Sequence, residues 1–328
     1  MKGMCAVMNF YHCSLIKMRK KVSIILCFLL GANLQVYSQP FCYNAKANSS
    51  AGKSENLVYK EYLSQKGKEK KLHLELVYPT DNLPSKKRPL IIGLHGSGFI
   101  NTCLAEACYF KYSKNILTKN FTPQGFITAS IEYRLASPFD FNPFDIKDDK
   151  LKELHYKAVQ DTRQAIRFIF ENAAKLGIDT DNVFLIGTSA GAITALNTVF
   201  LDNEEVPAVL IEQYGQLVKR EKIKAVISLS GAIYDLSYLD GGDKVPLLII
   251  HGKNDSIVPI DKGFYLNVKH LTPVYGGRAV FEQAQTKGIP VKGFFYDFGH
   301  SYPDNLLTDI FQNTNDFIRT NLTCESSK

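Results

Sequence analysis

The chain of 328 residues has no tryptophan, no internal repeat and no low-complexity linker. The absence of tryptophan removes one common platform for stacking sugar rings. Without a repeat or a linker, a repetitive array or a string of separate domains is not expected. Hydrophobic residues make up 45% of the chain. That content is enough for a substantial core, so a disordered chain is not expected either.

A dense basic stripe is also missing, although the formal net charge is +7. The first 38 residues contain five of the 39 basic residues and none of the 32 acidic ones. The remaining 34 basic residues nearly balance the acidic ones and leave a charge of +2. We therefore expect no nucleic-acid partner, because such binding needs basic side chains gathered on one surface.

The N-terminal apolar run, Val22–Leu30, falls well short of the ~20 residues that a membrane span needs. It follows the basic cluster Arg19–Lys21 and precedes Val36–Ser38, where small residues stand at the positions that a signal peptidase reads. The pattern predicts a signal peptide cleaved between Ser38 and Gln39, with a membrane anchor as the less favoured alternative. The mature chain would then be secreted or periplasmic, with no stable membrane anchor.

Met18 stands directly before that basic cluster, so translation from Met18 would make residues 1–17 an upstream extension. Cys27 lacks the small residues that a lipoprotein signal places before its cysteine, so lipidation is not favoured. We predict an N-terminal extension and signal peptide at 1–38 and a single domain at 39–328.

Cysteine and histidine spacings typical of zinc sites are absent, so no metal site is predicted. Four cysteines follow the predicted cleavage point, and an even number in an exported protein favours two disulfides. Among the three possible pairings we favour Cys103 with Cys108 and Cys42 with Cys324. Four unpaired thiols are the alternative.

Hydrophobic periodicity predicts an α/β fold with a mostly parallel, doubly wound sheet and helices on both faces. Leu72–Tyr78 alternates apolar and polar residues as a half-buried edge strand does, and the polar residues from 39 to about 70 predict a surface strand or a loose arm. The runs that predict strands buried on both faces are Leu90–Leu94, Phe126–Ile131, Val183–Ile186, Ile223–Leu229, Val245–Ile250 and Val291–Phe298. Helical spacing is found in Leu151–Leu176, Ala190–Phe200 and Leu306–Ile318.

The five residues Gly187–Gly191 (Gly-Thr-Ser-Ala-Gly) join a predicted strand to a predicted helix. A turn this tight strains the serine backbone and exposes the hydroxyl, so glycines are needed two residues to either side. Ser189 is therefore a candidate nucleophile, although the pattern alone is weak evidence.

A serine hydroxyl needs a base, usually a histidine oriented by a carboxylate. His300 follows a late strand on a loop that would lie over the carboxyl edge of the sheet. The other six histidines lie in the removed segment (His12), on an early strand (His73), in helical stretches (His155, His270) or in strand-end turns (His95, His251). The acid is predicted to be Asp255, just past a buried strand, because Asp243 precedes that strand and Asp261 lies beyond the turn.

The segment His95–Phe99 follows another predicted strand and is rich in small residues. Small residues let the backbone approach a substrate closely, and a tetrahedral intermediate needs backbone N–H donors for its oxyanion. We expect the N–H groups of Ser97, Gly98 and Ala190 to form this oxyanion hole. A plain glycine-rich turn is the alternative.

From about Leu72 to Ile318 the chain resembles the α/β-hydrolase superfamily, in particular the hormone-sensitive-lipase-like and type B carboxylesterase-like esterases. The residues that carry the resemblance are His95–Gly98, Tyr133–Leu135, Asp161, Gly187–Gly191, His251-Gly252 with Asp255, and Gly299-His300. The order serine, acid, histidine is that of this fold. The resemblance implies a structural Arg134 paired with an acid such as Asp161. This chain differs from the family at two positions. Ser97 stands where the family often has glycine, and Gly191-Ala192 stands where the elbow of the family often ends Gly-Gly.

These features predict a serine hydrolase that cleaves carboxylic esters through an acyl-enzyme, with Ser189, Asp255 and His300 as its triad and no cofactor. The expected substrate is a small-molecule or glycan ester. A carbohydrate esterase that removes acetyl or feruloyl groups and a serine peptidase are alternatives, and a non-catalytic interaction domain is least favoured. Four aromatic residues are candidates for the lining of an acyl pocket: Phe99, Phe139, Phe141 and Phe144. The alternative is that they belong to the core.

Two segments are candidates for insertions that cover the site: Ser137–Lys150 and Asp202–Lys222. The alternative is that both are ordinary connections.

Overall fold

The computed structural model describes residues 51–64, 67–80, 87–101, 109–137, 145–241 and 244–323. All of these residues belong to one unit of the chain, Cys42–Lys328. Several predictions lie outside the described residues: the signal peptide and its cleavage site, the two disulfides, Asp243, and the acyl-pocket candidates Phe139, Phe141 and Phe144.

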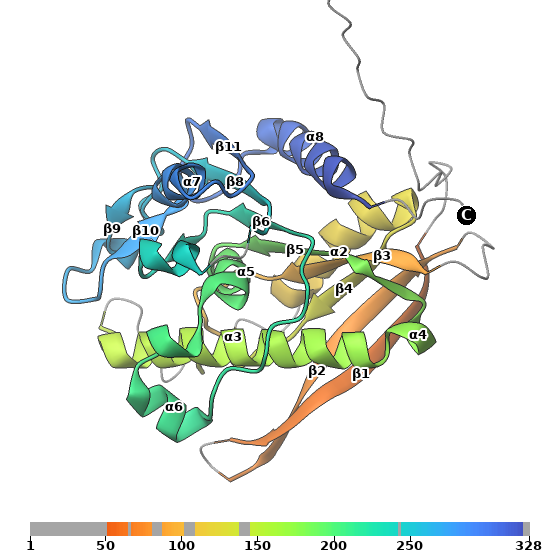
Figure 1. Cartoon of the computed structure of the whole chain (residues 1–328), viewed down its shortest axis with the longest axis horizontal. Coiled ribbons are helices and arrows are strands. Elements are labelled where there is room, and N and C mark those ends of the chain that lie inside the picture. The colour runs from red at the N-terminus through yellow and green to blue at the C-terminus, as the bar shows by residue number, and fades with distance from the viewer. Residues whose placement is uncertain are drawn as a thin grey trace, which may run out of the picture. The chain divides into compact units, whose positions relative to one another are not determined.

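Eight strands form one sheet in the order β1-β2-β4-β3-β5-β6-β8-β11 (Figure 1). They are β1 (Ala51–Leu63), β2 (Glu69–Pro79), β3 (Arg88–Leu94), β4 (Ile127–Ile131), β5 (Ile178–Thr188), β6 (Ala225–Leu229), β8 (Leu247–Gly252) and β11 (Val291–Tyr296). β2 pairs antiparallel with both β1 and β4, whereas every neighbouring pair from β4 to β11 is parallel. The predicted mostly parallel sheet is confirmed, and β1 is a surface strand rather than a loose arm.

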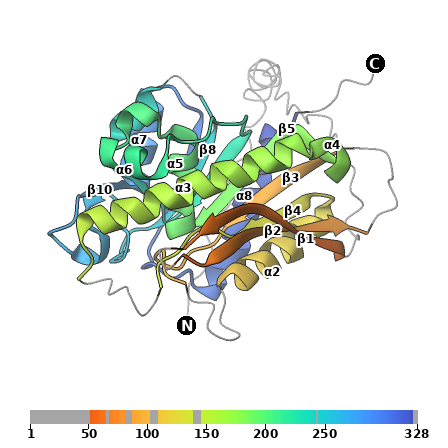
Figure 2. The ribbon, with the colours of Figure 1, turned by 90° about the horizontal axis from the view of Figure 1, so that it is seen from below.

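Successive side chains of the central strands enter two different cores, because a strand points its side chains alternately to opposite faces. Ile91 and Phe184 pack on one face with α2 and α8, while their neighbours Ile92 and Leu185 pack on the other with α3, α5 and α7. Figure 2 looks at the sheet from the α3 side. The helices are α2 (Tyr109–Phe121), α3 (Asp148–Glu171), α4 (Ala173–Leu176), α5 (Ala190–Phe200), α6 (Ala208–Tyr214), α7 (Gly277–Thr286) and α8 (Asp304–Asn321).

Some elements differ from the prediction or were not predicted. The helix expected over Leu151–Leu176 is divided at Asn172, whose side chain donates to Phe168 O at 2.8 Å and so competes with the helical ladder. His270, expected in a helix, lies in a turn with Nε2 3.0 Å from Ile146 O. The sequence did not predict helices α2 and α7 or a small second sheet. The strands of this second sheet are β7 (Ala232–Ile233), β9 (Lys262–Gly263) and β10 (Val274–Gly276). Strands of two or three residues are too short to show a periodicity.

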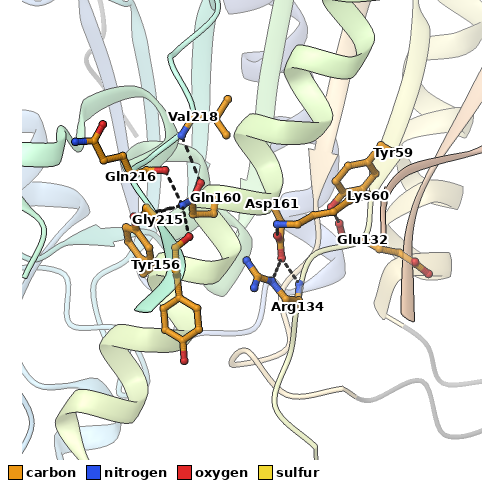
Figure 3. Close-up of polar contacts among 11 residues, drawn as sticks. Tyr59, Lys60, Glu132, Arg134, Tyr156, Gln160, Asp161, Gly215, Gln216 and Val218 are labelled. Carbon is orange, nitrogen blue, oxygen red and sulfur yellow. Dashed lines mark hydrogen bonds and ion pairs between the residues drawn. The ribbon is translucent and has the colours of Figure 1, made fainter. Parts of the chain in front are cut away.

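Asp161 anchors α3 to the edge of the sheet (Figure 3). Its carboxylate is fully buried and accepts hydrogen bonds from the backbone N–H of Arg134 at 2.9 Å and from Arg134 Nε at 2.7 Å. The ammonium of Lys60, from β1, lies 2.6 Å from the other carboxylate oxygen. The structure therefore confirms the implied pairing of Arg134 with Asp161.

Gln160, the preceding residue of α3, binds the segment that follows α6 (Figure 3). Its Nε2 donates to Gln216 O at 2.8 Å and to Gly215 O at 3.2 Å, and its Oε1 accepts from the Val218 N–H at 3.3 Å. The segment Asp202–Lys222 thus packs on α3 as an ordinary connection, and it contributes no lining residue to the cavity beside Ser189.

Candidate active site

Ser189 occupies the single-residue turn between β5 and α5. Its backbone has φ 54° and ψ −123°, a conformation that costs a non-glycine residue of order 1–3 kcal/mol. Its N–H donates to Leu229 O at 2.8 Å and its carbonyl accepts from the Ile193 N–H at 3.0 Å. These bonds from the neighbouring strand and helix hold the serine in its strained conformation.

Gly187 and Gly191 are required by close backbone contacts rather than by left-handed torsion angles. A Cβ on Gly187 would lie 2.2 Å from Gly191 O, and a Cβ on Gly191 would lie 2.0 Å from Leu94 O and 2.7 Å from His95 O. Atoms cannot approach so closely without a backbone shift, so a side chain on Gly187 would distort the turn itself, and one on Gly191 would displace the turn from the end of β3.

The structure brings the predicted serine, histidine and aspartate into one hydrogen-bonded line. Ser189 Oγ lies 2.8 Å from His300 Nε2, and His300 Nδ1 lies 2.7 Å from Asp255 Oδ2. A carboxylate accepts hydrogen bonds only, so Nδ1 carries a proton and the neutral ring leaves Nε2 free to accept from the serine hydroxyl. The serine is half-buried and the His300 side chain is 23% exposed, so the line opens to solvent at its serine end.

The side chain of Asp255 is fully buried, and both of its oxygens are hydrogen-bonded. Oδ1 accepts from the backbone N–H groups of Ile257 and Val258, each at 2.9 Å. Burial acts to raise the pKa of Asp255, but bonds from His251, His300 and Val258 outweigh it and hold that pKa below its usual range. The carboxyl is therefore ionised at neutral pH. The rejected alternative Asp261 instead forms an ion pair with Arg278.

His251 supports the acid, a role that the sequence analysis missed. Its Nδ1 accepts from the Gly277 N–H at 3.2 Å, which leaves the ring proton on Nε2. Nε2 lies 3.1 Å from Val258 O and 3.3 Å from Asp255 Oδ2. The ring thus links β8, the acid loop and the start of α7. The sequence carries no clear signal for this role, since the residue reads as the end of a buried strand.

The segment after β3 turns sharply at three consecutive residues, with φ of 147° at Ser97, 61° at Gly98 and 63° at Phe99. The Ser97 carbonyl accepts from the Ile100 N–H at 3.1 Å, which closes the turn. In the described part of the chain, the N–H groups of Ser97 and Gly98 have no hydrogen-bond acceptor. The N–H of Ala190 lies in the first turn of α5, where helical N–H groups lack an intrahelical partner. None of the three predicted donors therefore has a hydrogen-bond acceptor among the described residues.

A cavity of about 90 Å³ lies beside Ser189. Most of its wall is apolar and comes from α3, α5, the turn after β3 and the segment after β8. Lining residues include Phe99, His155, Ser189, Ile193, Tyr265 and Leu271. Of the aromatic residues predicted for an acyl pocket, Phe99 is therefore in place.

A family model named BD-FAE matches residues 74–243, just over half of the chain. The chain belongs to the BD-FAE family. The matched range includes the elbow and the turn after β3, and it ends before Asp255 and His300.

Solved structures with the same fold include esterase 2 of Thermogutta terrifontis with propionate bound, with a TM-score of 0.57 and 19% identity over 84% of this chain and 96% of that one. MGS-M1, an α/β-hydrolase from a deep-sea metagenome of the Medee basin, has a TM-score of 0.50 and 14% identity over 83% of this chain and 99% of that one. This BD-FAE family member thus has the α/β-hydrolase fold that the sequence predicted.

Two curated relatives are fungal lipases. The chain is 28% identical over 136 residues to "Secreted triacylglycerol lipase LIP1" of Gibberella zeae and 27% identical over 126 residues to "Lipase 2" of Geotrichum candidum. These stretches are 41% and 38% of this chain but only 22% and 21% of the lipases. With the fold and the family, they identify an esterase- and lipase-like α/β-hydrolase.

The described residues contain neither a membrane-spanning helix nor a metal-binding cluster. No helix there is long and apolar enough to cross a membrane. Within the same ranges, no three histidine, cysteine or acidic side chains gather as a metal site would require.

Proposed function

We propose that the protein is a serine hydrolase that cleaves carboxylic esters through an acyl-enzyme. The observation that carries this proposal is the hydrogen-bonded line from Ser189 through His300 to Asp255 beside an apolar cavity. The three residues follow one another in the chain in the order typical of the α/β-hydrolase fold.

In the first half-reaction, Ser189 Oγ bonds to the ester carbonyl carbon while His300 Nε2 accepts the hydroxyl proton. His300 then gives that proton to the departing alcohol as the carbon–oxygen bond breaks. In the second half-reaction, His300 takes a proton from water, the hydroxide attacks the acyl carbon, and Ser189 leaves with the proton restored. Asp255 keeps the proton of His300 on Nδ1 and stabilises the imidazolium.

The oxyanion of each tetrahedral intermediate would accept from the N–H groups of Ser97, Gly98 and Ala190. Their free N–H groups support this role, as does the contact of Gly191 with the end of β3, which brings the two sources of donors together. Replacement of the family's usual glycine by Ser97 keeps the N–H, and the Ser97 Oγ is buried with no hydrogen-bond partner among the described residues. Each such donor typically contributes about 3 kcal/mol to stabilising the transition state.

The proposed location is secreted or periplasmic, with residues 39–328 as a single mature domain. The N-terminal sequence pattern supports export, and one lipase relative is named as secreted. The disulfides Cys103–Cys108 and Cys42–Cys324 belong to the same proposal.

The test combines active-site labelling with turnover. The wild-type protein should bind a fluorophosphonate covalently and hydrolyse short-chain p-nitrophenyl esters, and Ser189→Ala should lose labelling and at least roughly 10⁴-fold in kcat. Peptide amides and acetylated sugars, assayed beside the p-nitrophenyl esters, separate a peptidase and a carbohydrate esterase from a general carboxylesterase.

Ser228→Ala is the matched control, because Ser228 is a buried serine on the neighbouring strand β6 and its Oγ has no hydrogen-bond partner among the described residues. It should label and turn over as the wild type does. The proposal fails if the wild-type protein neither labels nor hydrolyses any ester.

A further inference from the structure

The loop between β11 and α8, which carries His300, is hydrogen-bonded to the rest of the fold on both sides of the histidine. Before His300, the Phe298 carbonyl accepts from the Asn254 N–H at 3.0 Å. After His300, the Tyr302 hydroxyl lies 2.8 Å from Ser230 Oγ. The first bond joins the histidine loop to the segment that carries the acid. The second joins it to the residue that follows β6, which the proposed reaction does not use.

Ser230 lies next to a residue that holds the nucleophile in place. The Leu229 carbonyl accepts from the Ser189 N–H at 2.8 Å, and the N–H of Ser230 donates to Ile250 O at 2.8 Å. These two bonds join the end of β6 to the turn that carries the nucleophile and to β8, which precedes the acid. The bond between Ser230 and Tyr302 therefore connects the histidine loop to the strand end that positions Ser189.

Ser230 stands at a position where glycine would be the less strained residue. Its φ is 56°, in the left-handed region, where a side chain costs backbone energy that glycine avoids. A glycine would offer no hydroxyl, however. Ser230 is fully buried, and among the described residues the only hydrogen bond of its Oγ is the one to Tyr302. The bond to the histidine loop thus gives this strained serine a use for its side chain.

Tyr302 is an uncharged partner in this bond. Burial raises the pKa of the Tyr302 hydroxyl, and the charge of Asp255 acts in the same direction, although the bond with Ser230 acts to lower it. The phenol ring packs beside that of Phe298 at 4.9 Å between centroids and against the core on the α8 side of the sheet. The hydroxyl therefore stays protonated near neutral pH, and the bond does not change with pH there.

We propose that Ser230 and Tyr302 are a positioning pair for His300, whose hydrogen bond sets the distance between His300 Nε2 and Ser189 Oγ. The inference rests on the proposed function, because it concerns the base of the same site. Neither residue lines the cavity beside Ser189, so both act through His300 and not on the substrate. The bonds on either side keep the loop in place while the imidazole takes the proton from Ser189 and passes it to the departing alcohol.

The first test removes each hydroxyl in turn and then both together. Tyr302→Phe and Ser230→Ala should each lower kcat for p-nitrophenyl butanoate by roughly tenfold, because a small displacement of a catalytic group slows the chemical step. KM should change by less than about twofold, since the cavity is untouched. The double variant should lose no more than either single variant, because both substitutions break the same bond. Losses that multiply in the double variant would overturn the inference.

A second readout separates a displaced base from a loosened fold. In acylation His300 must protonate the ethanol that leaves an ethyl ester, whereas p-nitrophenolate leaves without a proton at neutral pH. A displaced histidine should therefore reduce kcat/KM for ethyl butanoate at least roughly threefold more than for p-nitrophenyl butanoate. Loss of folded protein would reduce the two rates by the same factor, and equal losses would contradict the positioning role.

Ser230→Gly keeps the test decisive if another variant is unstable. Glycine removes the hydroxyl and also relieves the positive φ, so its two effects on stability oppose each other. The midpoint of urea denaturation should stay near that of the wild type, while kcat should fall as it does in Ser230→Ala. A purely structural role would instead make the loss of kcat follow the loss of stability.

Tyr296→Phe is the matched control. It also removes a tyrosine hydroxyl, one that bonds to Asp309 and Asn313 of α8 and not to the site, and it should keep the wild-type kcat. The inference is overturned if Tyr302→Phe and Ser230→Gly keep the wild-type kcat, or if Tyr296→Phe loses as much as they do. Either result leaves the proposed function intact, because the wild-type protein still hydrolyses esters. A wild-type protein that hydrolyses no ester would remove the proposed function itself.

Discussion

Two parts of helix α3 bury polar side chains to the same degree and use them differently. Gln160 and Asp161 are saturated with hydrogen bonds from the backbone, from Arg134 and from Lys60. His155, less than two turns earlier on the same helix, lines the cavity, and neither of its buried ring nitrogens has a hydrogen-bond partner among the described residues. The saturated part fastens α3 to its neighbours, whereas the unsaturated part belongs to the wall of the cavity beside Ser189.

The difference follows from the cost of removing a polar group from water. A buried group repays that cost only when it is hydrogen-bonded, so saturated groups can stabilise the fold while open groups reduce its stability. The polar groups without a partner are also the ones whose hydrogen-bonding capacity is unused. Stability measurements along α3 can therefore separate its two parts.

The largest effect is expected at Asp161. Asp161→Ala leaves Arg134 and Lys60 without their buried partner and should lower the free energy of unfolding by about 3 kcal/mol, measured by urea denaturation. Glu171→Ala removes an exposed carboxylate whose partner is the surface residue Arg167, and it should change stability by less than ~0.5 kcal/mol. Equal effects at both positions would contradict the anchoring role of Asp161.

A second effect is the dependence of the free energy of unfolding on pH through His155. Because the pKa of folded His155 is lowered to about 3 from an ordinary 6.5, the unfolded chain binds a proton between these values that the folded chain does not. The free energy of unfolding should therefore fall as pH drops below 6.5, by up to ~1.4 kcal/mol per pH unit from this residue. The His155→Phe variant should lack this contribution to the pH dependence between pH 6.5 and 5, as measured by urea denaturation at each pH. Identical pH profiles of the variant and the wild type would refute the prediction.

A smaller loss is expected at Gln160. Gln160→Met keeps the length of the side chain and removes its bonds to the carbonyls of Gly215 and Gln216 and to the N–H of Val218. The free energy of unfolding should fall by roughly 1–2 kcal/mol, because these backbone groups lose their partner. Thermal unfolding followed by circular dichroism measures the change, and an unchanged midpoint would show that water replaces the amide.

The smallest effect on stability, and one of opposite sign, is expected at His155. At neutral pH His155→Phe removes two unpartnered nitrogens from an aromatic cluster and should leave the free energy of unfolding unchanged or raise it by up to ~1 kcal/mol. Urea denaturation at pH 7.5 beside Gln160→Met gives the comparison. A loss as large as that of Gln160→Met would place His155 with the structural part of α3.

The sequence predicted most of the sheet because buried parallel strands are continuous apolar runs. For example, the predicted strand Val183–Ile186 lies within β5, and the predicted strand Val245–Ile250 overlaps β8. It also predicted which three residues would meet in the line from Ser189 to Asp255, since chain order and strand ends are visible in a pattern. Their catalytic roles stay predictions until the labelling experiment is done.

Two features of the site could not be predicted. His155 lies at a helical core position in the sequence, and only the packed structure shows that its nitrogens have no partner. His251 ends a buried strand, and its link to Asp255 depends on Gly277 of α7, which is distant in sequence and belongs to a helix that the pattern missed. Both depend on tertiary contacts, which a local periodicity does not encode.

The contact of Gly191 with Leu94 and His95 is made by backbone atoms alone, with no side chain between the two strand ends. The spacing between the turn at Ser189 and the end of β3 is therefore set at this contact by backbone atoms and not by a side-chain rotamer. A substitution of an apolar wall residue such as Leu271 can therefore change the shape of the cavity without acting on this contact directly, which makes the wall a suitable target for redesign.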